Sequence, residues 1–558
     1  MRGTDPATPE GLVSAAFGWR LAVMLAALLL PACAAPPTAR PPLHLTVLHT
    51  NDHHGRFWPN PDGEYGMAAR KTVIDRVRAE VAAAGGCTLL LDGGDVNTGA
   101  PESDLQNAEP DFRAMSLIGY DAAAVGNHEF DKPPAVLAKQ REWATFPLLS
   151  ANIYKDGRRF FEPYRIFERC GYRIAVLGLT TVDTKKYALP VSLEGFEFRE
   201  PLAEVTALLP ELHAKADVVI AVSHLGHFPN GVRGTNSPGD VELARALPAP
   251  APGKGLDLIV SGHSDKIVCM LRENVRDDAY VPGQPCMPDR QNGTWIVHAL
   301  EWGKYVGRAD LELRGGEVDL LKFELMPINL KRRAADGSLS TYAEPIAEDP
   351  GLRDFLQPFQ DRGHAATGIV VGEAVGVFDG DRSRVRLGPV SLGRLIAQAM
   401  AEKTGADLAV MNAGGIRASL PDGKLTNRDL LNAQPWSNQL VVVRMSGAEL
   451  LAWLKVAASM RLTAGGFPQT FGVQMLIEGG VLKEARVRGQ PIEAQREYRL
   501  VVNEFVFLGG DAYPSLDNHP GAVNTGFVDV EVLREYIAAR SPIRAADYAS
   551  GNDVQRKP

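Results

Sequence analysis

Five short apolar runs in this sequence are each followed at once by glycine and by residue types that bind metal ions. The runs, with the letters that follow them, are 43–50 before NDHHG, 88–91 before DGGD, 122–125 before GNHEFD, 218–222 before SHLGH and 258–260 before SGHSD. Segments with helical apolar spacing, such as 67–84, lie between the runs. Strands that alternate with helices predict an α/β fold for this half of the chain.

The residues after these runs are expected to converge, because functional side chains of α/β folds collect at the carboxyl ends of strands. The candidates are Asp52, His54, Asp95, Asn127, His224 and His263. Carboxylate, amide and imidazole groups suit Zn²⁺, Mn²⁺ or similar divalent ions rather than thiolate chemistry. The set is too large for one tetrahedral ion, whereas two ions that share a carboxylate would use it fully and would suit displacement at phosphorus. The neighbouring His49, His53 and His227 are expected to pack or to form supporting hydrogen bonds.

The composition limits the class of protein. The chain has 558 residues, enough for more than one domain, and its 45% hydrophobic and 23% charged residues are typical of a soluble globular protein. Lys plus Arg number 59 against 67 for Asp plus Glu, a net charge of −8. Because this balance lacks the basic surface that holds a phosphate polymer, no nucleic-acid polymer is expected as a partner, although small anions remain open. No repeat or heptad pattern favours a purely structural protein.

The N-terminal segment has the features of an export signal. The uncharged apolar run 21–30 follows Arg20 and is too short to span a bilayer, which is typical of a signal-peptide core. The letters LPAC at 30–33 resemble a bacterial lipobox and predict a signal peptide over 1–33 with lipidation of Cys33; ordinary cleavage after a small residue such as Ala35 is the alternative. The Pro-rich stretch 34–42 would then be a tether. We expect a periplasmic or cell-envelope location, with lipid anchoring to the outer membrane as one form.

Export would place the other cysteines in an oxidising compartment, which permits disulfides. Cys269 and Cys286 flank a short loop that contains proline and glycine, and they are the predicted pair. Cys87 begins an apolar run and Cys170 precedes another, so both are predicted to be small buried thiols.

A second α/β domain is predicted after a charged, helix-compatible connector at 341–367. Its apolar runs are 408–411, 440–444 and 498–502, and the helical segments between them include 392–403 and 448–460. This half shows no second set of metal ligands, so recognition is its expected role.

Arg382 and Arg386 are four residues apart and would face one way on a helix, although solvated surface arginines are the commoner meaning of such a pair. Two aromatic residues with a carboxylate and several arginines can clamp a base, bind ribose and neutralise phosphate.

The motifs together resemble those of the calcineurin-like metallophosphoesterases. They are NDHHGRF at 51–57, GGDVNTG at 93–99, GNHEFD at 126–131, SHLGH at 223–227 and SGHSD at 261–265. The likeness to the bacterial periplasmic 5'-nucleotidase/UDP-sugar hydrolase family extends from about residue 43 to 548. It implies a two-domain α/β protein. A four-layer metallophosphoesterase β-sandwich flanked by helices would occupy 43–340, and an α/β nucleotide-binding domain would occupy 368–550.

The resemblance also implies a ligand set and a catalytic pair. Asp52, His54 and Asp95 would hold a first ion, and Asp95 would bridge to a second ion held by Asn127, His224 and His263. Asp265 stands where the family typically has Gln, and its negative charge should tighten the first site. His128 and Asp131 match the catalytic pair, with His128 stabilising charge on the phosphoryl group. The cofactors would be two divalent metal ions, Zn, Mn or Co, which activate water as the nucleophile.

The family's nucleotide-binding positions fall in the second half. They match Arg382, Arg386, Arg417, Trp436, Asn438, Gly465, Phe505 and Asp511. Trp436 replaces a Phe of the family's stacking pair, and an indole should still stack a base. The implied substrates are nucleoside 5'-phosphates and UDP-sugars, and the implied state is a monomer whose C-terminal domain rotates about the connector.

Two other functions would share part of this sequence pattern. A 2',3'-cyclic-nucleotide phosphodiesterase/3'-nucleotidase would share the catalytic half, but Arg382 with Arg386 and the surroundings of Trp436 argue against it. A nucleotide-binding receptor without catalysis should lack metal ligands or the catalytic pair. Every expected position except Asp265 carries the expected residue type.

Overall fold

The computed structural model describes residues 42–188, 190–227, 239–250, 254–264, 267–314, 316–334, 336–517, 519–549 and 553–557. Residues Leu43–Pro558 form one compact unit. The predicted signal peptide with Cys33, and the predicted tether up to residue 41, lie outside the described residues. In the part of the chain that is described, no helix is long and apolar enough to cross a membrane.

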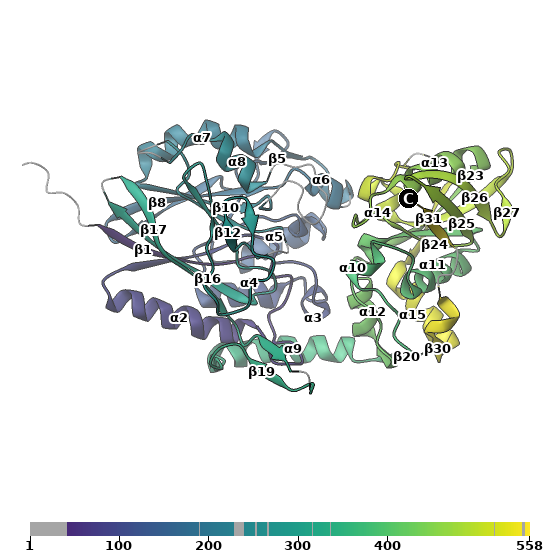
Figure 1. Ribbon diagram of the computed structural model, residues 1–558, viewed down its shortest axis with the longest axis horizontal. Helices are drawn as coiled ribbons and strands as arrows, with labels where there is room; N and C mark the ends of the chain where they lie inside the picture. Colours follow the sequence, from purple (N-terminus) through teal and green to yellow (C-terminus); the bar gives the residue numbers. More distant parts are fainter. Residues whose placement is uncertain are drawn as a thin grey trace, which may run out of the picture. The chain divides into compact units, whose positions relative to one another are not determined.

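Two six-stranded sheets form the centre of the first half (Figure 1). The first has the order β17 (Glu317–Pro327), β16 (Tyr305–Arg314), β1 (Leu43–Thr50), β2 (Cys87–Asp92), β3 (Ala122–Ala124), β4 (Leu148–Leu149). The second has the order β14 (Asp289–Gln291), β15 (Thr294–Val297), β11 (Leu258–Ser261), β10 (Val218–His224), β8 (Tyr172–Thr180), β7 (Tyr164–Arg169). Because β1, β2 and β3 are parallel, and β8, β10 and β11 are parallel, the carboxyl ends within each set share one edge.

The sheets pack face to face, and helices cover both outer faces. Leu45 and Val47 of β1 join Val176 and Ile220 of the second sheet in the apolar layer between the sheets. The covering helices are α2 (Met67–Ala83), α4 (Glu109–Ile118) and α5 (Pro134–Trp143) on the first sheet, and α7 (Pro201–Lys215) and α8 (Asp240–Ala246) on the second. The order helix, sheet, sheet, helix confirms the predicted four-layer sandwich.

Helix α2 begins at the residue predicted from the sequence. Gly66 precedes it at φ 89°, and a Cβ there would lie 2.9 Å from the Pro59 nitrogen, so glycine is required. Val73 and Val77 are buried at helical spacing, as the apolar pattern predicts. Arg70 is fully buried on the same face, which the apolar pattern does not predict.

The first half also contains small elements around this sandwich. They are α3 (Pro101–Asp104), α6 (Thr184–Tyr187), η1 (His128–Phe130), η2 (Pro190–Leu193), β5 (Ile153–Lys155), β6 (Arg158–Arg159), β9 (Phe196–Phe198), β12 (Met270–Arg272), β13 (Val275–Arg276), β18 (Lys331–Arg333) and β19 (Leu339–Thr341).

Helix α9 (Pro350–Thr367) occupies most of the predicted connector. The Asp349 carboxylate caps its first turn by accepting a hydrogen bond from the Leu352 nitrogen at 2.8 Å. Leu352 and Leu356 pack into the apolar cluster beneath the first sheet, so α9 is anchored to the first half.

The second half is an α/β unit with its own apolar core. Its main sheet has the order β24 (Pro468–Phe471), β21 (Leu408–Asn412), β28 (Glu497–Asn503), β23 (Gln439–Ser446), β29 (Ala522–Val528). Two smaller sheets consist of β22 (Gly423–Thr426), β20 (Val370–Val375), β30 (Ile543–Arg544) and of β27 (Gln490–Pro491), β26 (Val481–Val487), β25 (Val473–Glu478), β31 (Val554–Lys557). The helices are α10 (Arg382–Val385), α11 (Ser391–Thr404), α12 (Asn427–Ala433), α13 (Gly447–Ser459), α14 (Glu504–Phe507), α15 (Asp529–Arg540), η3 (Ala413–Gly415), η4 (Gly510–Ala512) and η5 (Ala545–Tyr548). The predicted second α/β domain is thus confirmed in its class.

Two disulfides are present among the described residues. Cys269 is bonded to Cys286, the pair expected from the sequence. Cys87 is bonded to Cys170, so the expectation of two buried thiols was wrong. Cys87 begins β2 and Cys170 lies in the turn between β7 and β8, and the packing of the two sheets brings their Cα atoms within 6.2 Å across 83 residues of sequence.

Candidate functional site

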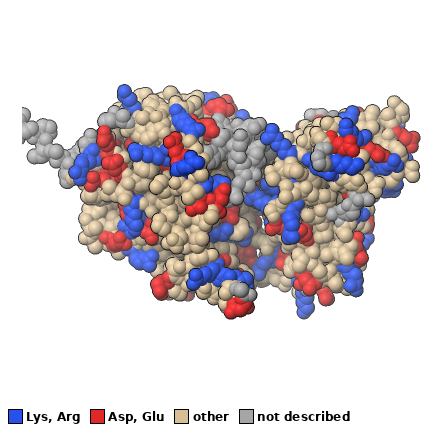
Figure 2. All heavy atoms as spheres, in the orientation of Figure 1, with Lys and Arg blue, Asp and Glu red and all other residues tan. Residues whose placement is uncertain are grey.

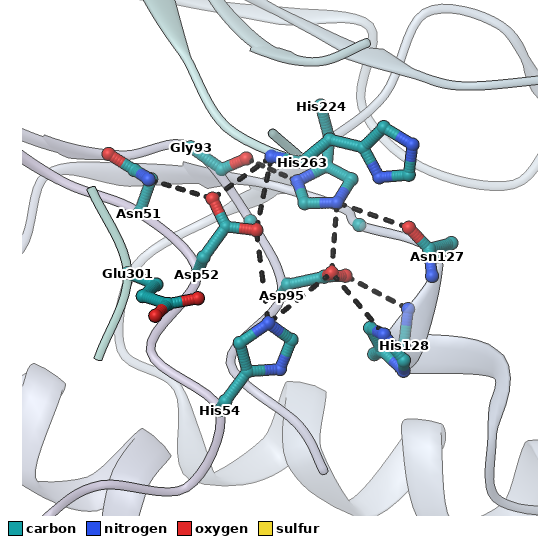
Figure 3. Close-up of polar contacts among 12 residues, drawn as sticks. Asn51, Asp52, His54, Gly93, Asp95, Asn127, His128, His224, His263 and Glu301 are labelled. Atoms are coloured by element: carbon teal, nitrogen blue, oxygen red, sulfur yellow. Dashed lines mark hydrogen bonds and ion pairs between the residues drawn. The ribbon is translucent and has the colours of Figure 1, made fainter. Parts of the chain in front are cut away.

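The loops after β1 and β2 run side by side, because these parallel strands end at the same edge of the first sheet. The Asp52 nitrogen donates to the Gly94 carbonyl at 2.9 Å, and the His54 nitrogen donates to the Asp95 carbonyl at 3.1 Å. These backbone hydrogen bonds place the side chains of Asp52, His54 and Asp95 at one position (Figure 3).

The second sheet contributes two histidines to the same position. His224 ends β10 and His263 follows β11, and both are buried. The His263 nitrogen donates to both carboxylate oxygens of Asp52, at 3.1 and 2.9 Å, which joins the loops of the two sheets. The candidate ligands predicted from separate strands therefore converge, except Asp265, which lies outside the described residues.

Four of these residues have backbone conformations that are rare for side chains other than glycine. Asp52, His54, Asp95 and His263 have φ values of 50°, 52°, 58° and 72°. Such conformations cost of order 1–3 kcal/mol each and cluster at functional sites, where the surrounding structure holds them. The strained backbone indicates that the surrounding structure fixes these four side chains in place at a cost in backbone energy, as is common at functional sites.

The donor geometry around Asp95 requires a positive charge. A carbonyl only accepts, so His224 Nδ1 must donate to the Gly93 carbonyl at 2.8 Å, and His224 Nε2 then faces Asp95 Oδ2 at 3.0 Å and Asn127 Oδ1 at 3.2 Å. Burial lowers the pKa of His224, but the Asp95 carboxylate outweighs burial and raises that pKa to about 9. Three acceptor atoms that meet in a buried space need a proton or a cation between them.

Two overlapping groups bring potential ligand atoms together, and His128 in the first group is the predicted catalytic residue rather than a predicted metal ligand. The groups are His54 with Asp95 and His128, and Asp95 with His224 and His263, and the ligand atoms within each group lie within 4.8 Å of one another. His54 Nδ1 donates to the Thr98 carbonyl at 2.9 Å, which directs its Nε2 towards Asp95 Oδ2 at 3.9 Å. Ligating histidines commonly donate the other ring nitrogen to a carbonyl in this way. The residues present therefore fit a pair of metal ions that share Asp95.

The short helix η1 begins at His128, and Asp131 follows directly after its last residue. His128 Nδ1 lies 2.6 Å from Asp131 Oδ2, and because a carboxylate accepts, Nδ1 carries the proton. The His128 backbone nitrogen donates to Asp95 Oδ1 at 2.9 Å, and His128 Nε2 lies 3.8 Å from Asp95 Oδ2. The ring is thus fixed in one tautomer beside the candidate metal ligands.

A pocket contains this pair and most of the predicted nucleotide-binding residues. Its lining residues are Thr98, Asn127, His128, Asp131, Lys132, Arg386, Asn412, Gly414, Gly415, Arg417, Pro435, Trp436, Asn438, Gly465, Asn503, Phe505 and Asp511. Arg382 is absent from the described lining, because it begins α10 whereas Arg386 follows that helix. Four further lining residues, Thr98, Lys132, Asn412 and Asn503, were not predicted as site residues, although Thr98 lies within the GGDVNTG motif at 93–99.

Asp511 is held at the centre of the recognition residues. Asn412 Nδ2 donates to Asp511 Oδ2 at 2.6 Å, and Asn503 Nδ2 donates to Asn412 Oδ1 at 2.9 Å. Cβ atoms at Gly414 and Gly465 would each lie 2.7 Å from an Asp511 carboxylate oxygen, which explains both glycines. Burial raises the pKa of Asp511, and the charges of nearby arginines oppose that rise.

Aromatic and cationic groups surround the same pocket. The Trp436 ring stacks on the His128 ring with centroids 5.4 Å apart and 6° between the planes. The Arg417 guanidinium carbon lies 5.5 Å from the Trp436 ring centroid. A pocket with a flat aromatic face, a carboxylate and arginines can hold a base, ribose hydroxyls and phosphate.

The fold and the site together define a two-domain phosphoesterase. The family model for calcineurin-like phosphoesterases matches residues 45–266, and the model for the 5'-nucleotidase C-terminal domain matches residues 365–518.

Protein UshA of Yersinia enterocolitica is 49% identical over 92% of this chain and 94% of its own length. A 5'-nucleotidase of Vibrio cholerae is 49% identical over 91% of this chain and 93% of its own length. The crystal structure of a 5'-nucleotidase precursor from Thermus thermophilus has a TM-score of 0.73 and 29% identity, over 92% of this chain and all of that one.

The chain belongs to the 5'-nucleotidase family of hydrolases, with a calcineurin-like phosphoesterase domain that uses divalent metal ions. The family suggested by the sequence motifs is therefore confirmed.

Proposed function

We propose that this protein is an exported, metal-dependent 5'-nucleotidase that converts nucleoside 5'-phosphates to nucleoside and phosphate, and that it also converts UDP-sugars to sugar 1-phosphate and uridine. One observation carries the proposal: a single pocket contains His128 and Asp131 together with Arg386, Arg417 and Phe505. The name 5'-nucleotidase of the Vibrio cholerae relative supports nucleoside 5'-phosphates as substrates. In this proposal, residues 43–340 perform catalysis, 341–367 connect, and 368–550 recognise the nucleotide.

The metal ions would be held by the ligand set described above. Asp52, His54 and Asp95 would bind one ion, with Asp265 as a further ligand, and Asp95 would be shared with a second ion. Asn127, His224 and His263 would complete that second site. Such ions act as Lewis acids, making water nucleophilic near neutral pH and offsetting negative charge on the phosphoryl group.

The protein's own groups orient the substrate and stabilise charge. Asp131 keeps the proton on His128 Nδ1 and favours the cationic ring, so that Nε2 can donate to the phosphoryl oxygens as their charge grows. Arg386 and Arg417 would neutralise phosphate, and Asp511 would accept from ribose hydroxyls. Trp436 and Phe505 would stack the base, a contact that tolerates different bases because every base has a flat face.

The proposal includes location and state. The expected signal peptide favours a periplasmic or cell-envelope enzyme, with Cys33 as a candidate lipidation site, and a monomer is expected. Lys and Arg are interspersed with Asp and Glu on the face in Figure 2, without one dominant charge among the described residues shown there. This pattern suits small nucleotide substrates rather than a nucleic-acid polymer.

The deciding experiment measures phosphate release from AMP and sugar-phosphate release from UDP-glucose by the purified mature protein. We expect both activities to disappear after chelation and to return with Mn²⁺, Zn²⁺ or Co²⁺. A 3'-phosphate or a 2',3'-cyclic phosphate hydrolysed in preference to AMP would replace the proposed substrate class. Tight nucleotide binding without hydrolysis in any metal would indicate a receptor.

A further inference from the structure

A buried arginine beneath the candidate metal ligands has no role in the site described above. Arg70 lies on helix α2, and its side chain is fully buried. Its guanidinium donates to two neutral groups, to His53 Nδ1 at 3.0 Å and to the Tyr120 hydroxyl at 3.4 Å. Burying a charge without direct pairing is costly, and an apolar residue of similar size would often stabilise such a position. The retained charge therefore calls for a functional reason.

The first contact fixes the loop that carries two candidate ligands. His53 stands between Asp52 and His54, both at left-handed φ. Arg70 only donates, so His53 Nδ1 accepts and His53 Nε2 donates to Asp111 Oδ1 at 2.8 Å. Hydrogen bonds to both ring nitrogens fix the His53 ring, and this also restrains the backbone of the neighbouring Asp52 and His54.

The second contact leads to the loop that carries Asp95. Thr50 Oγ1 donates to Asp92 Oδ2 at 2.5 Å, so it accepts from the Tyr120 hydroxyl at 2.7 Å, and that hydroxyl accepts from Arg70. Asp92 Oδ1 in turn accepts from the Gly94 nitrogen at 2.9 Å, one residue before Asp95. These aligned hydrogen bonds connect the guanidinium to a buried carboxylate at the end of β2.

A third loop meets the same guanidinium. A Cβ at Gly303 would lie 1.6 Å from Arg70 Nη2, so the glycine backbone passes directly over the guanidinium. The neighbouring Trp302 nitrogen donates to the Asp52 carbonyl at 2.7 Å. Arg70 therefore supports three loops that meet at Asp52 and Asp95.

We propose that Arg70 is a positioning residue, which holds the loops of Asp52, His54 and Asp95 through His53 and Tyr120 and thereby sets the affinity of the site for divalent metal ions. The inference rests on the proposed metal-dependent function. Hydrogen-bonded supports of metal ligands commonly change metal affinity or activity by about 10- to 100-fold when they are removed.

The test compares Arg70→Lys with Arg78→Lys. Lys keeps the charge of Arg70 but cannot donate to both His53 and Tyr120 in the same fork geometry. Arg78 lies on the same helix and uses its fork on the carbonyls of Ile118 and Gly119, both at 2.6 Å. Arg78→Lys thus removes a similar fork away from the ligand loops. The affinity of each metal-free protein for Mn²⁺ and Zn²⁺ would be measured by competition with a chelating dye, without substrate, alongside its melting temperature.

We expect Arg70→Lys to bind metal about 10- to 100-fold more weakly than wild type, and Arg78→Lys to stay within about threefold of wild type. Folded Arg70→Lys with wild-type affinity would overturn the inference, as would an equal loss in Arg78→Lys. If Arg70→Lys does not fold, Tyr120→Phe decides: it removes only the hydroxyl, and unchanged affinity in that variant would refute the role. Wild type that binds metal but hydrolyses no nucleotide would remove the proposed function and leave this comparison valid.

Discussion

Asp257 gives a test of how burial shapes the pH dependence of stability. Asp257 is buried at the amino end of β11, away from the candidate metal ligands, and its Oδ2 accepts from the Val219 nitrogen at 2.8 Å. Burial raises its pKa from 3.8 to about 7, opposed by that hydrogen bond. Because the folded chain holds this proton more tightly than the unfolded chain, the contribution to stability is complete below about pH 4 and is lost as the pH rises through 7.

The substitution Asp257→Asn removes the titration and keeps an oxygen that can accept from Val219. The pKa difference corresponds to a wild-type penalty of about 1.7 kcal/mol at pH 5 and about 4 kcal/mol at pH 8. The unfolding free energy of Asp257→Asn relative to wild type should therefore rise by about 2.5 kcal/mol between these pH values.

Urea unfolding of metal-free wild type and variant at pH 5, 6, 7 and 8 measures this difference. Asp217→Asn is a matched control, because Asp217 Oδ2 also accepts from a strand nitrogen, that of Arg173 at 2.9 Å, but 22% of its side chain is exposed to water. A difference for Asp257→Asn that stays constant within about 0.5 kcal/mol from pH 5 to 8 would refute the reasoning.

Three further predictions concern the proposed site. His128→Ala should lower kcat by about 10²- to 10⁴-fold in AMP hydrolysis with metal content unchanged by elemental analysis; wild-type turnover would contradict its role. Trp436→Ala should raise KM for AMP by about 10- to 100-fold, and Trp436→Phe should raise it far less, because Phe can still stack on the base. Equal KM values for the two variants would show that Trp436 does not stack on the base. Gly465→Ala places a methyl 2.7 Å from the Asp511 carboxylate, so nucleotide affinity by calorimetry should fall while metal affinity stays unchanged; unaltered nucleotide affinity would count against Asp511 as a ligand.

The arrangement of the first half could be predicted because two sequence signals indicate each of the five site-forming strands: an apolar run, and the glycine and ligand-type residues that follow it. The run 43–50 has the bounds of β1, and the runs at 218–222 and 258–260 are each extended by one or two residues in β10 and β11. Parallel pairing then brings the strand ends together, which is why ligand types distant in sequence meet around Asp95.

Other features could not be predicted because they depend on tertiary packing, which produces no recognisable pattern in the local sequence. The Cys87–Cys170 bond needs the relative placement of two sheets, which no spacing of cysteines reveals. Arg70 occupies a position that helical periodicity assigns to an apolar residue, and only its contacts with His53 and Tyr120 explain it. Lys132 and Asn503 line the pocket, but a single lysine or asparagine in a sequence is most often a surface or turn residue.

The bond between Cys87 and Cys170 has a practical consequence for producing this enzyme. It joins the two sheets at the amino end of β2, whereas the candidate ligands follow the carboxyl end of that strand. A chain made in a reducing cytosol would lack this cross-link while retaining every residue of the pocket. Recombinant batches could therefore agree in turnover and differ in shelf life, so thiol content belongs beside specific activity as a measure of quality.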